Sequence, residues 1–197
     1  YKMEEEIFYQ KKSIKRIIDD KNDLIINKLN ESNIKFENIQ RVLVIGMGSS
    51  FNAGLLGSYY FESISSLKSE TINASEFIDS KRIIDSNDLV IGVTQSGETA
   101  DTIAAIDMEI KRRSSIEDKK FKPNLIAITN RKESSIGRQV SNIIDICAGI
   151  EVGVAATKTF FAQLLSFYGL AIKFAEIKGS QSLDEISNLI NELINLP

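Results

Sequence analysis

Two short segments of this sequence combine glycines with hydroxyl side chains in a pattern suited to holding an anion. Residues 46–50 (Gly-Met-Gly-Ser-Ser) follow the apolar run 42–45, and residues 94–99 (Thr-Gln-Ser-Gly-Glu-Thr) follow the apolar run 89–93. Glycines let the backbone turn sharply, and the free N–H groups at a helix start attract an anion. Serine and threonine add neutral donors. Two such turns in one small α/β domain predict a single phosphate held between them.

The composition excludes several other kinds of site. Histidine is absent and Cys147 is the only cysteine. Ser-His-Asp and Cys-His arrangements, a conventional zinc site and an internal disulfide are therefore excluded, and we predict neither a metal nor a cofactor. A single free cysteine fits the reducing cytoplasm, where we expect the protein to act. Cys147 itself is interpreted as a small apolar residue that ends strand 143–147.

Length and charge narrow the class of protein further. The 197 residues are 43% hydrophobic and 26% charged, as is ordinary for a globular domain. The net charge is −3 and the basic residues are scattered, so we expect no nucleic-acid partner. No apolar run approaches the roughly 20 residues that span a bilayer, and the acidic start of the chain is no signal peptide, so we expect no membrane association.

Alternating hydrophobic patterns predict an α/β protein. Short aliphatic strands are expected at 42–45, 70–73, 89–93, 125–129 and 143–147, and helices at 50–63, 99–113, 134–139 and 157–176. Strands of this kind are typical of a parallel sheet buried on both faces. The order predicts a three-layer α/β/α sandwich with a five-stranded, doubly wound parallel sheet. Helix 157–176 is apolar around most of its circumference, so it must be buried on more than one side.

We expect residues 1–197 to form one domain with helical extensions. Residues 1–29 repeat apolar positions at helical spacing, which predicts an N-terminal amphipathic helix. The sheet and its crossover helices occupy 41–176, and a C-terminal amphipathic helix occupies 180–196. The two amphipathic helices and helix 157–176 offer more apolar surface than one sheet face usually covers, so self-association or domain docking is expected.

Other interpretations of the turns are weaker. A dinucleotide-binding turn needs a third glycine where Phe51 stands, and a phosphate-binding P-loop needs a Gly-Lys-Ser/Thr that is absent. The turn 94–99 could be an ordinary helix cap, with Ser96 capping and Glu98 and Asp101 complementing the helix dipole beside solvent. That interpretation leaves three polar side chains of the turn without a task. A third glycine-containing segment, 149–159, either wraps a ligand or is simply a loop.

Four segments together carry a family resemblance. Residues 48–54 (Gly-Ser-Ser-Phe-Asn-Ala-Gly), 74–77 (Ala-Ser-Glu-Phe), 94–102 and 151–158 (Glu-Val-Gly-Val-Ala-Ala-Thr-Lys) resemble, in order and spacing, the first sugar isomerase (SIS) domain of the glutamine:fructose-6-phosphate aminotransferase family. The resemblance implies that Ser50, Thr94, Gln95, Ser96 and Thr99 hold a sugar phosphate, with the backbone of Gly48 and Ser49 close by. It implies that Val154, with Ala156 nearby, contacts the sugar. Thr94 and Ala156 stand where the family commonly has serine.

The resemblance also implies an activity. The ligand would be a hexose 6-phosphate, fructose 6-phosphate or the product glucosamine 6-phosphate, in the first step of amino-sugar biosynthesis. The parent enzyme would add a glutaminase domain and a second SIS domain and would act as a homodimer. Its Glu, His and Lys would come from the second SIS domain and the tail, so we assign no catalytic residue to this chain.

Two rivals stay open at this point. Another SIS sugar-phosphate isomerase would need a complete acid–base set. The sensor domain of a transcription regulator would need a helix-turn-helix upstream, whereas residues 1–29 supply one amphipathic helix.

Overall fold

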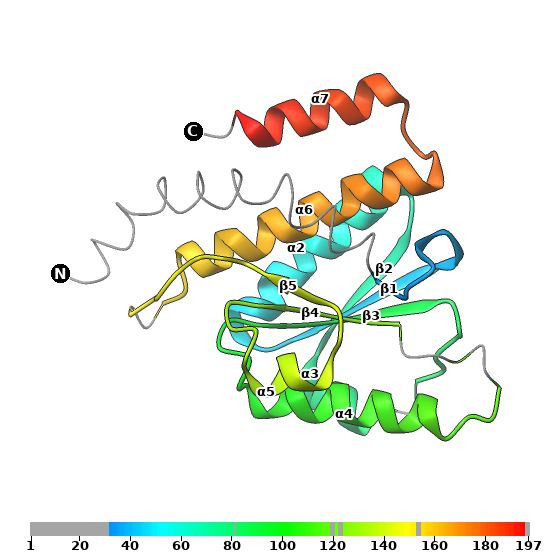
Figure 1. Cartoon of the computed structure of the whole chain (residues 1–197), viewed down its shortest axis with the longest axis vertical. Coiled ribbons are helices and arrows are strands. Elements are labelled where there is room, and N and C mark those ends of the chain that lie inside the picture. The colour runs from blue at the N-terminus through cyan, green and yellow to red at the C-terminus, as the bar shows by residue number, and fades with distance from the viewer. Residues whose placement is uncertain (1–31, 81, 119–120, 122–123, 153–154, 196–197) are drawn as a thin grey trace.

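The computed structural model describes residues 32–80, 82–118, 121, 124–152 and 155–195. The amphipathic helix predicted within residues 1–29 lies outside these residues. Within them, strands and helices alternate along the chain, as the sequence predicts (Figure 1).

The centre of the fold is a five-stranded sheet. Its strands are β1 (Arg41–Gly46), β2 (Lys68–Asn73), β3 (Asp88–Thr94), β4 (Leu125–Thr129) and β5 (Ile143–Asp145). All pair in parallel, in the order β2-β1-β3-β4-β5. The chain runs from β1 to β2 on one side and then crosses back to β3 on the other side of β1, so the strand order reverses between β1 and β3. Open α/β sheets bind ligands at such a switch point, outside the carboxyl ends of the strands.

The strands differ in burial. Every residue of β3 and β4 is buried, and five of the six in β1 are too. The expectation that all strands are buried on both faces is wrong for β2, where only Ile72 is buried. This strand lies at the edge of the sheet, where Lys68 and Glu70 are exposed, whereas Ser69 and Thr71 are half-buried and form hydrogen bonds with Ser58. Strand β5 is also shorter than predicted, because it ends at Asp145.

Two layers of helices cover the sheet (Figure 1). On one face lie α2 (Gly48–Ser65), α6 (Lys158–Lys178) and α7 (Leu183–Ile194), whose apolar side chains share a core with β1, β3 and β4. On the other face lie α3 (Ala74–Asp79), α4 (Ala100–Ser114) and α5 (Ser135–Gln139), which form a second core. The three-layer prediction is therefore confirmed. Helix α3 and the short 3-10 helix η1 (Phe36–Asn38), whose Phe36 ring packs edge-on against Phe174 of α6, were not predicted.

Helix α6 corrects the expectation about apolar runs. A stretch of 18 of its 21 residues is apolar enough to cross a membrane by length and composition alone, and 56% of that stretch is buried inside the protein. Because α6 packs against both α2 and α7, it is a core helix of this fold. Its burial on more than one side was predicted from its apolar circumference.

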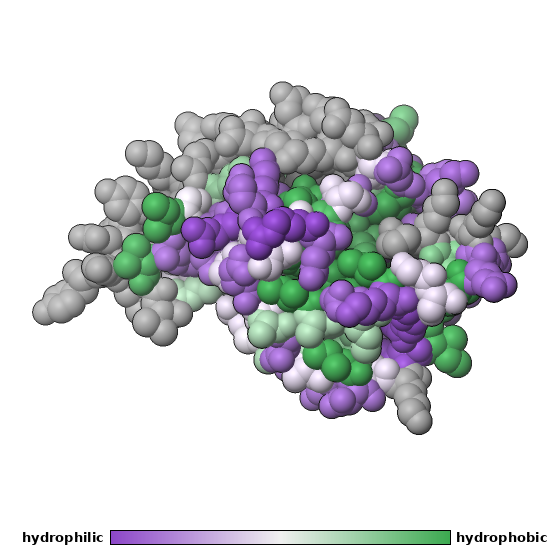
Figure 2. Space-filling view, turned by 60° about the horizontal axis from the view of Figure 1, so that its bottom comes forward, coloured by the Kyte–Doolittle hydropathy of each residue, from purple (hydrophilic) through white to green (hydrophobic). Residues whose placement is uncertain are grey.

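The opposite layer presents a mixed surface. Seen from the side on which α4 lies, hydrophobic side chains form small groups between hydrophilic ones (Figure 2). Helix α2 carries three exposed apolar side chains close together in the sequence, Leu55, Leu56 and Tyr59, which are 50%, 42% and 64% exposed.

Candidate functional site

The two predicted turns begin side by side at the carboxyl edge of the sheet. In the β1–β3 register Gly46 lies opposite Val93, so the segments that follow these two residues leave the sheet from neighbouring positions. The first turn runs into α2 and the second into α4. The switch point of the sheet therefore lies where the sequence places its two hydroxyl-rich turns.

The helices at this point differ from the others in their N-terminal capping. The side chains of Asn73, Ser134 and Ser182 cap α3, α5 and α7. The carboxylate of Glu151 accepts from the backbone N–H groups at the start of α6. In the described part of the chain, no side chain accepts a hydrogen bond from the first-turn N–H groups of α2 or α4. Uncapped N–H groups at two adjacent helix starts favour a bound anion.

Within the second turn, the hydroxyl groups bind one another and the backbone. Thr94 Oγ1 lies 2.8 Å from Thr99 Oγ1 and accepts from the Gly97 N–H at 3.3 Å. Ser96 Oγ accepts from the Glu98 N–H at 3.1 Å. The residue at the N-cap position of α4 is Thr99. The interpretation of Ser96 as a helix cap is therefore wrong, since its hydroxyl tightens the turn that precedes the helix.

Gly97 fixes how closely this turn approaches the next loop. Its φ is +71°, and a Cβ at this position would lie 1.9 Å from the Oγ of Ser134. The Ile136 N–H donates to the Gly97 carbonyl at 3.1 Å. Only glycine fits this position, and the turn is held against the start of α5.

Glu98 also binds α5. Its carboxylate accepts from the hydroxyl and the N–H of Ser135, at 2.6 and 2.9 Å. These two bonds, the hydroxyl first, lower the pKa of Glu98 below its ordinary value. Glu98 is exposed, as expected, and its carboxylate also links two loops of the edge.

The first turn places one hydroxyl inside the protein. Gly48 opens α2 with a φ of +54°, and both Gly48 and Ser49 are exposed. The third residue of the helix, Ser50, is 6% exposed, and its Oγ accepts from the side-chain amide of Gln163 in α6 at 3.0 Å. Sequence reasoning did not find Gln163, because the contact joins positions 113 residues apart.

A hollow of about 800 Å³ opens beside the second turn, within the size range of small-molecule sites. Of the predicted site residues, Gln95 and Ser96 line it. The other lining residues come from the ends of β4 and β5 and from the loop before α6: Asn130, Arg131, Asp145, Cys147, Gly149, Ile150 and Glu151. Thr94 and Ser50 are buried next to this edge. The two turns therefore lie close together, but not every predicted side chain lines the hollow.

Asn130 is a further residue that sequence reasoning missed. Its side chain donates to the Gly149 carbonyl at 2.7 Å and accepts from the Ala148 N–H at 2.9 Å. Its backbone N–H donates to the Gln95 carbonyl at 3.1 Å. Asn130 thus joins the second turn to the loop after β5. A signal was present, because a polar residue directly follows the buried strand β4.

The acidic groups around the hollow are engaged. Asp145 lies 3.3 Å from the ammonium of Lys132. Glu151 accepts from the N–H groups of Thr157 and Lys158 at 2.9 and 3.1 Å, so it caps α6. The Lys158 ammonium donates to the Ile150 carbonyl at 2.6 Å. The exposed guanidinium of Arg131 adds a positive charge to the lining of the hollow. A positive charge there would attract an anionic ligand.

Three predicted residues need separate mention. Cys147 does not end a strand: it lies two residues beyond β5, half-buried, with a φ of +50°. Val154 lies outside the described residues, so its predicted contact with the sugar stays a prediction. Ala156 is half-buried in the segment that leads to α6.

Among the described residues, no group of three or more His, Cys, Asp or Glu side chains could hold a metal ion.

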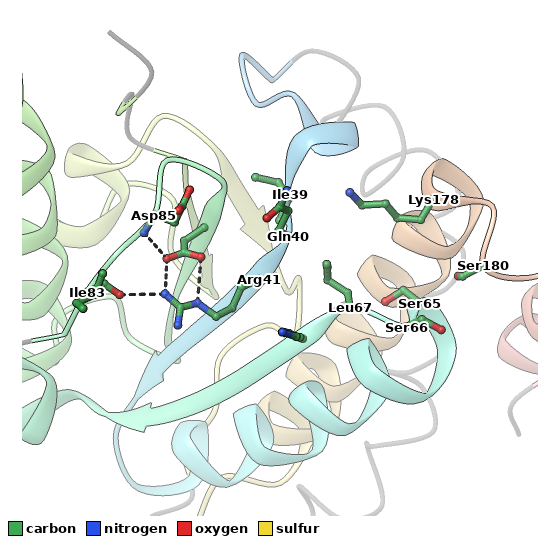
Figure 3. Close-up of a pocket in the computed structure, with 12 residues that line it drawn as sticks. Ile39, Gln40, Arg41, Ser65, Ser66, Leu67, Ile83, Asp85, Lys178 and Ser180 are labelled. Carbon is green, nitrogen blue, oxygen red and sulfur yellow. Dashed lines mark hydrogen bonds and ion pairs between the residues drawn. The ribbon is translucent and has the colours of Figure 1, made fainter. Parts of the chain in front are cut away.

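A second hollow, of about 700 Å³, lies at the opposite, amino edge of the sheet (Figure 3). There the guanidinium of Arg41 forms two hydrogen bonds with the Asp88 carboxylate, at 3.0 and 2.5 Å, and a third with the Ile83 carbonyl. Asp88 also accepts from the Asp85 N–H at 2.7 Å. These charged groups hold the chain between β2 and β3, which is a structural task.

Comparisons with known proteins agree on the class of domain. The SIS domain family matches residues 35–173. Glutamine–fructose-6-phosphate aminotransferase (isomerizing) from Synechocystis sp. is 46% identical over 161 residues, which are 82% of this chain and 25% of that protein. The aminotransferase of the same name from Cyanidium caldarium is 39% identical over 194 residues, 98% of this chain and 31% of that protein.

A solved structure extends the comparison to three dimensions. The C-terminal domain of glucosamine-fructose-6-phosphate aminotransferase from Francisella tularensis superposes with a TM-score of 0.83 at 26% identity, over 99% of this chain and 53% of that one. The chain thus spans a quarter to a third of the length of its curated relatives.

Proposed function

The chain belongs to the SIS domain family, and from that premise we propose that it binds the phosphate group of a hexose 6-phosphate at the carboxyl edge of β1 and β3. One observation carries the proposal: two adjacent helices start there without a side-chain cap, and each start is accompanied by serine or threonine hydroxyls. The phosphate would take the place of the missing caps. Its oxygens would accept hydrogen bonds from the backbone N–H groups that start α2 and α4, from which no side chain accepts in the described part of the chain.

Each predicted residue has a role in this proposal. The backbone N–H groups of Gly48 and Ser49 and the hydroxyl of Ser50 would bind from the α2 side. The side chains of Thr94, Gln95, Ser96 and Thr99 would bind from the α4 side, and Thr94, at 1% exposure, would mainly orient Thr99. The sugar would extend into the hollow beside Gln95, toward the segment that carries Val154 and Ala156.

The ligand we propose is fructose 6-phosphate, with glucosamine 6-phosphate as product. The support is the named activity of the relatives, which are aminotransferases acting on this sugar phosphate. Amination at C2 and isomerisation both need placed acids and bases. Three carboxylates at this edge, Glu98, Asp145 and Glu151, already accept hydrogen bonds from the backbone. The chain would hold the phosphate, and the proton transfers would fall to other parts of a larger enzyme.

We propose that those other parts are a glutaminase domain and a second SIS domain, with this chain as the first SIS domain of a cytoplasmic homodimer. The chain covers 53% of the Francisella structure, so about half of that structure has no counterpart in this chain. The exposed Leu55, Leu56 and Tyr59 of α2 would form part of a contact with such a domain or subunit. Sedimentation of the chain alone tests this, since a strictly monomeric species that binds no hydrophobic dye contradicts an association surface.

Calorimetric titration of the 197-residue chain with fructose 6-phosphate and with fructose tests the binding proposal. We expect measurable binding of the phosphate ester and none of the free sugar, because nearly all the proposed contacts are donors to an anion. Equal, weak binding of both would overturn the phosphate site.

Incubation with fructose 6-phosphate and ammonia tests the division of labour. We expect no glucosamine 6-phosphate above the buffer control. Turnover would instead favour the rival interpretation, a domain with a complete acid–base set of its own.

A further inference from the structure

The side chain of Gln163 connects helix α6 to the proposed phosphate site. It projects from the second turn of α6 and is 1% exposed. Its Nε2 donates to the Oγ of Ser50, the third residue of α2, at 3.0 Å. This is the one side-chain hydrogen bond between α6 and the start of α2 in the described part of the chain.

The hydrogen bond from Gln163 limits the groups to which the Ser50 hydroxyl can donate its proton. A serine hydroxyl carries one proton and can accept two hydrogen bonds. Serines inside helices commonly donate to the carbonyl four residues earlier, and Ser63, Ser65 and Ser166 do so here. Ser50 makes no such bond among those described. Since its oxygen accepts from Gln163, its own proton is left to donate to a group outside α2.

The other end of the amide is unusual. Gln163 Oε1 is buried and has no hydrogen-bond partner in the described part of the chain. A buried polar atom without a partner costs free energy, so packing alone does not explain a glutamine at this position. A function of the amide nitrogen, which donates to Ser50, would explain it.

We propose that Gln163 is a positioning residue that directs the Ser50 hydroxyl proton toward the ligand's phosphate. The proposal rests on the function proposed above. With the amide nitrogen facing Ser50, the phosphate meets a donor. With the amide reversed, Ser50 would donate inward to Oε1 and turn a lone pair toward the anion, which repels it.

A matched pair of glutamines makes the test specific. Gln181 also donates through its Nε2 to α2, but to the Ile64 carbonyl at the far end of that helix, at 3.1 Å. We expect Gln163→Met to weaken fructose 6-phosphate binding by about three- to tenfold, and Gln181→Met to leave it unchanged. Gln163→Glu should weaken binding more, because a carboxylate accepts the Ser50 proton and repels the phosphate. Circular dichroism and thermal melts show whether each variant is folded.

Combining Gln163→Met with Ser50→Ala separates positioning from packing. If Gln163 acts through Ser50, its substitution costs nothing further once the hydroxyl is gone. An equal loss of affinity in both backgrounds would mean that Gln163 only supports the fold, and would overturn the proposal. So would a Gln163→Met variant that binds as tightly as the unchanged chain.

A spectroscopic measurement covers the case in which the Gln163 variants do not fold. In the unchanged chain, the side-chain amide proton resonances of Gln163 should shift when fructose 6-phosphate is added, because a Ser50 hydroxyl that donates to an anion becomes a better acceptor. Resonances that stay in place while the ligand binds would overturn the inference. A chain that binds no fructose 6-phosphate at all would overturn the proposed function, which is a separate outcome.

Discussion

The two edges of the sheet each carry a hollow of similar size, about 800 Å³ at the carboxyl edge and about 700 Å³ at the amino edge, but they use their polar groups in opposite ways. At the carboxyl edge, two helix starts keep their N–H groups uncapped and are accompanied by neutral hydroxyls. At the amino edge, charged side chains are paired with one another and with backbone groups (Figure 3). The size of a hollow therefore does not distinguish the two edges, and the proposed site rests on the unused donors at the carboxyl edge.

The amino edge continues into a buried ionic network. Arg113, 2% exposed, donates to the Asp88 carbonyl at 3.1 Å and to the Glu109 carboxylate at 2.5 Å. Arg112 contacts the same carboxylate and lies over the Phe77 ring. Asp88 is the first residue of β3, so this network anchors the strand that ends at the proposed site. We expect changes at the amino edge to alter stability and changes at the carboxyl edge to alter binding.

The largest effect is expected from Glu109→Gln. The substitution removes the carboxylate from two arginines, one of them fully buried, which should lower the free energy of unfolding by about 3–5 kcal/mol. Urea denaturation measures it. The control is Asp107→Asn on the same helix, which breaks an exposed pair with Lys111 and should cost about 0–1 kcal/mol. Fructose 6-phosphate affinity in the folded Glu109→Gln variant should be unchanged, and a selective loss of affinity would break the contrast between the edges.

Next in size are Ser96→Ala and Thr99→Ala at the carboxyl edge. A hydrogen bond to a charged group contributes roughly 1.5–3 kcal/mol, so each variant should bind fructose 6-phosphate about ten- to a hundredfold more weakly. The control is Ser115→Ala at the other end of α4, whose hydroxyl donates to the Arg112 carbonyl. Titration calorimetry and thermal melts are measured together. If affinity is retained in both variants, these hydroxyls only shape the turn.

The smallest effect concerns Glu98, the carboxylate that links the two loops. Since its pKa is lowered in the folded protein, its contribution to stability is present above the unfolded pKa and is lost as the pH falls through the folded value. Thermal melts of the unchanged chain and of Glu98→Gln should differ most near neutral pH and converge below pH about 4.5, the ordinary value for this group.

Glu62→Gln is the control, since the Glu62 carboxylate has no hydrogen bond among those described. A stability difference for Glu98→Gln that persists unchanged in acid would contradict the link to Ser135.

Much of the fold could be predicted because its signals are local. The aliphatic runs of β1, β3 and β4 predict buried parallel strands, and the structure confirms them within one residue at each end. Helix α3 was not predicted: it begins at Ala74, directly after β2 ends at Asn73, so no loop residues separate it from the strand. The polar face of β2 was overlooked because the sequence does not say which strand lies at the edge of the sheet.

In the candidate site, too, the local features could be predicted from the sequence, whereas the contacts between distant segments could not. Both turns are encoded in consecutive residues: each contains a glycine with a positive φ, and in the second turn hydroxyls accept from backbone N–H groups two or three residues away. A phosphate site could therefore be proposed from the sequence, and binding of phosphate there stays a prediction.

The sequence by itself determined the strand–turn–helix units, the hydroxyl donors and the absence of histidine. Only the tertiary structure decided which of these units meet. Ser50 and Gln163 are 113 residues apart, and Asn130 reaches Gly149 across the end of the sheet. Such contacts depend on strand order and on how α6 packs against α2, and no pattern within a short window carries that information. The physical reason is that turns are set by local backbone preferences, whereas a buried hydrogen bond is set by the packing of the whole core.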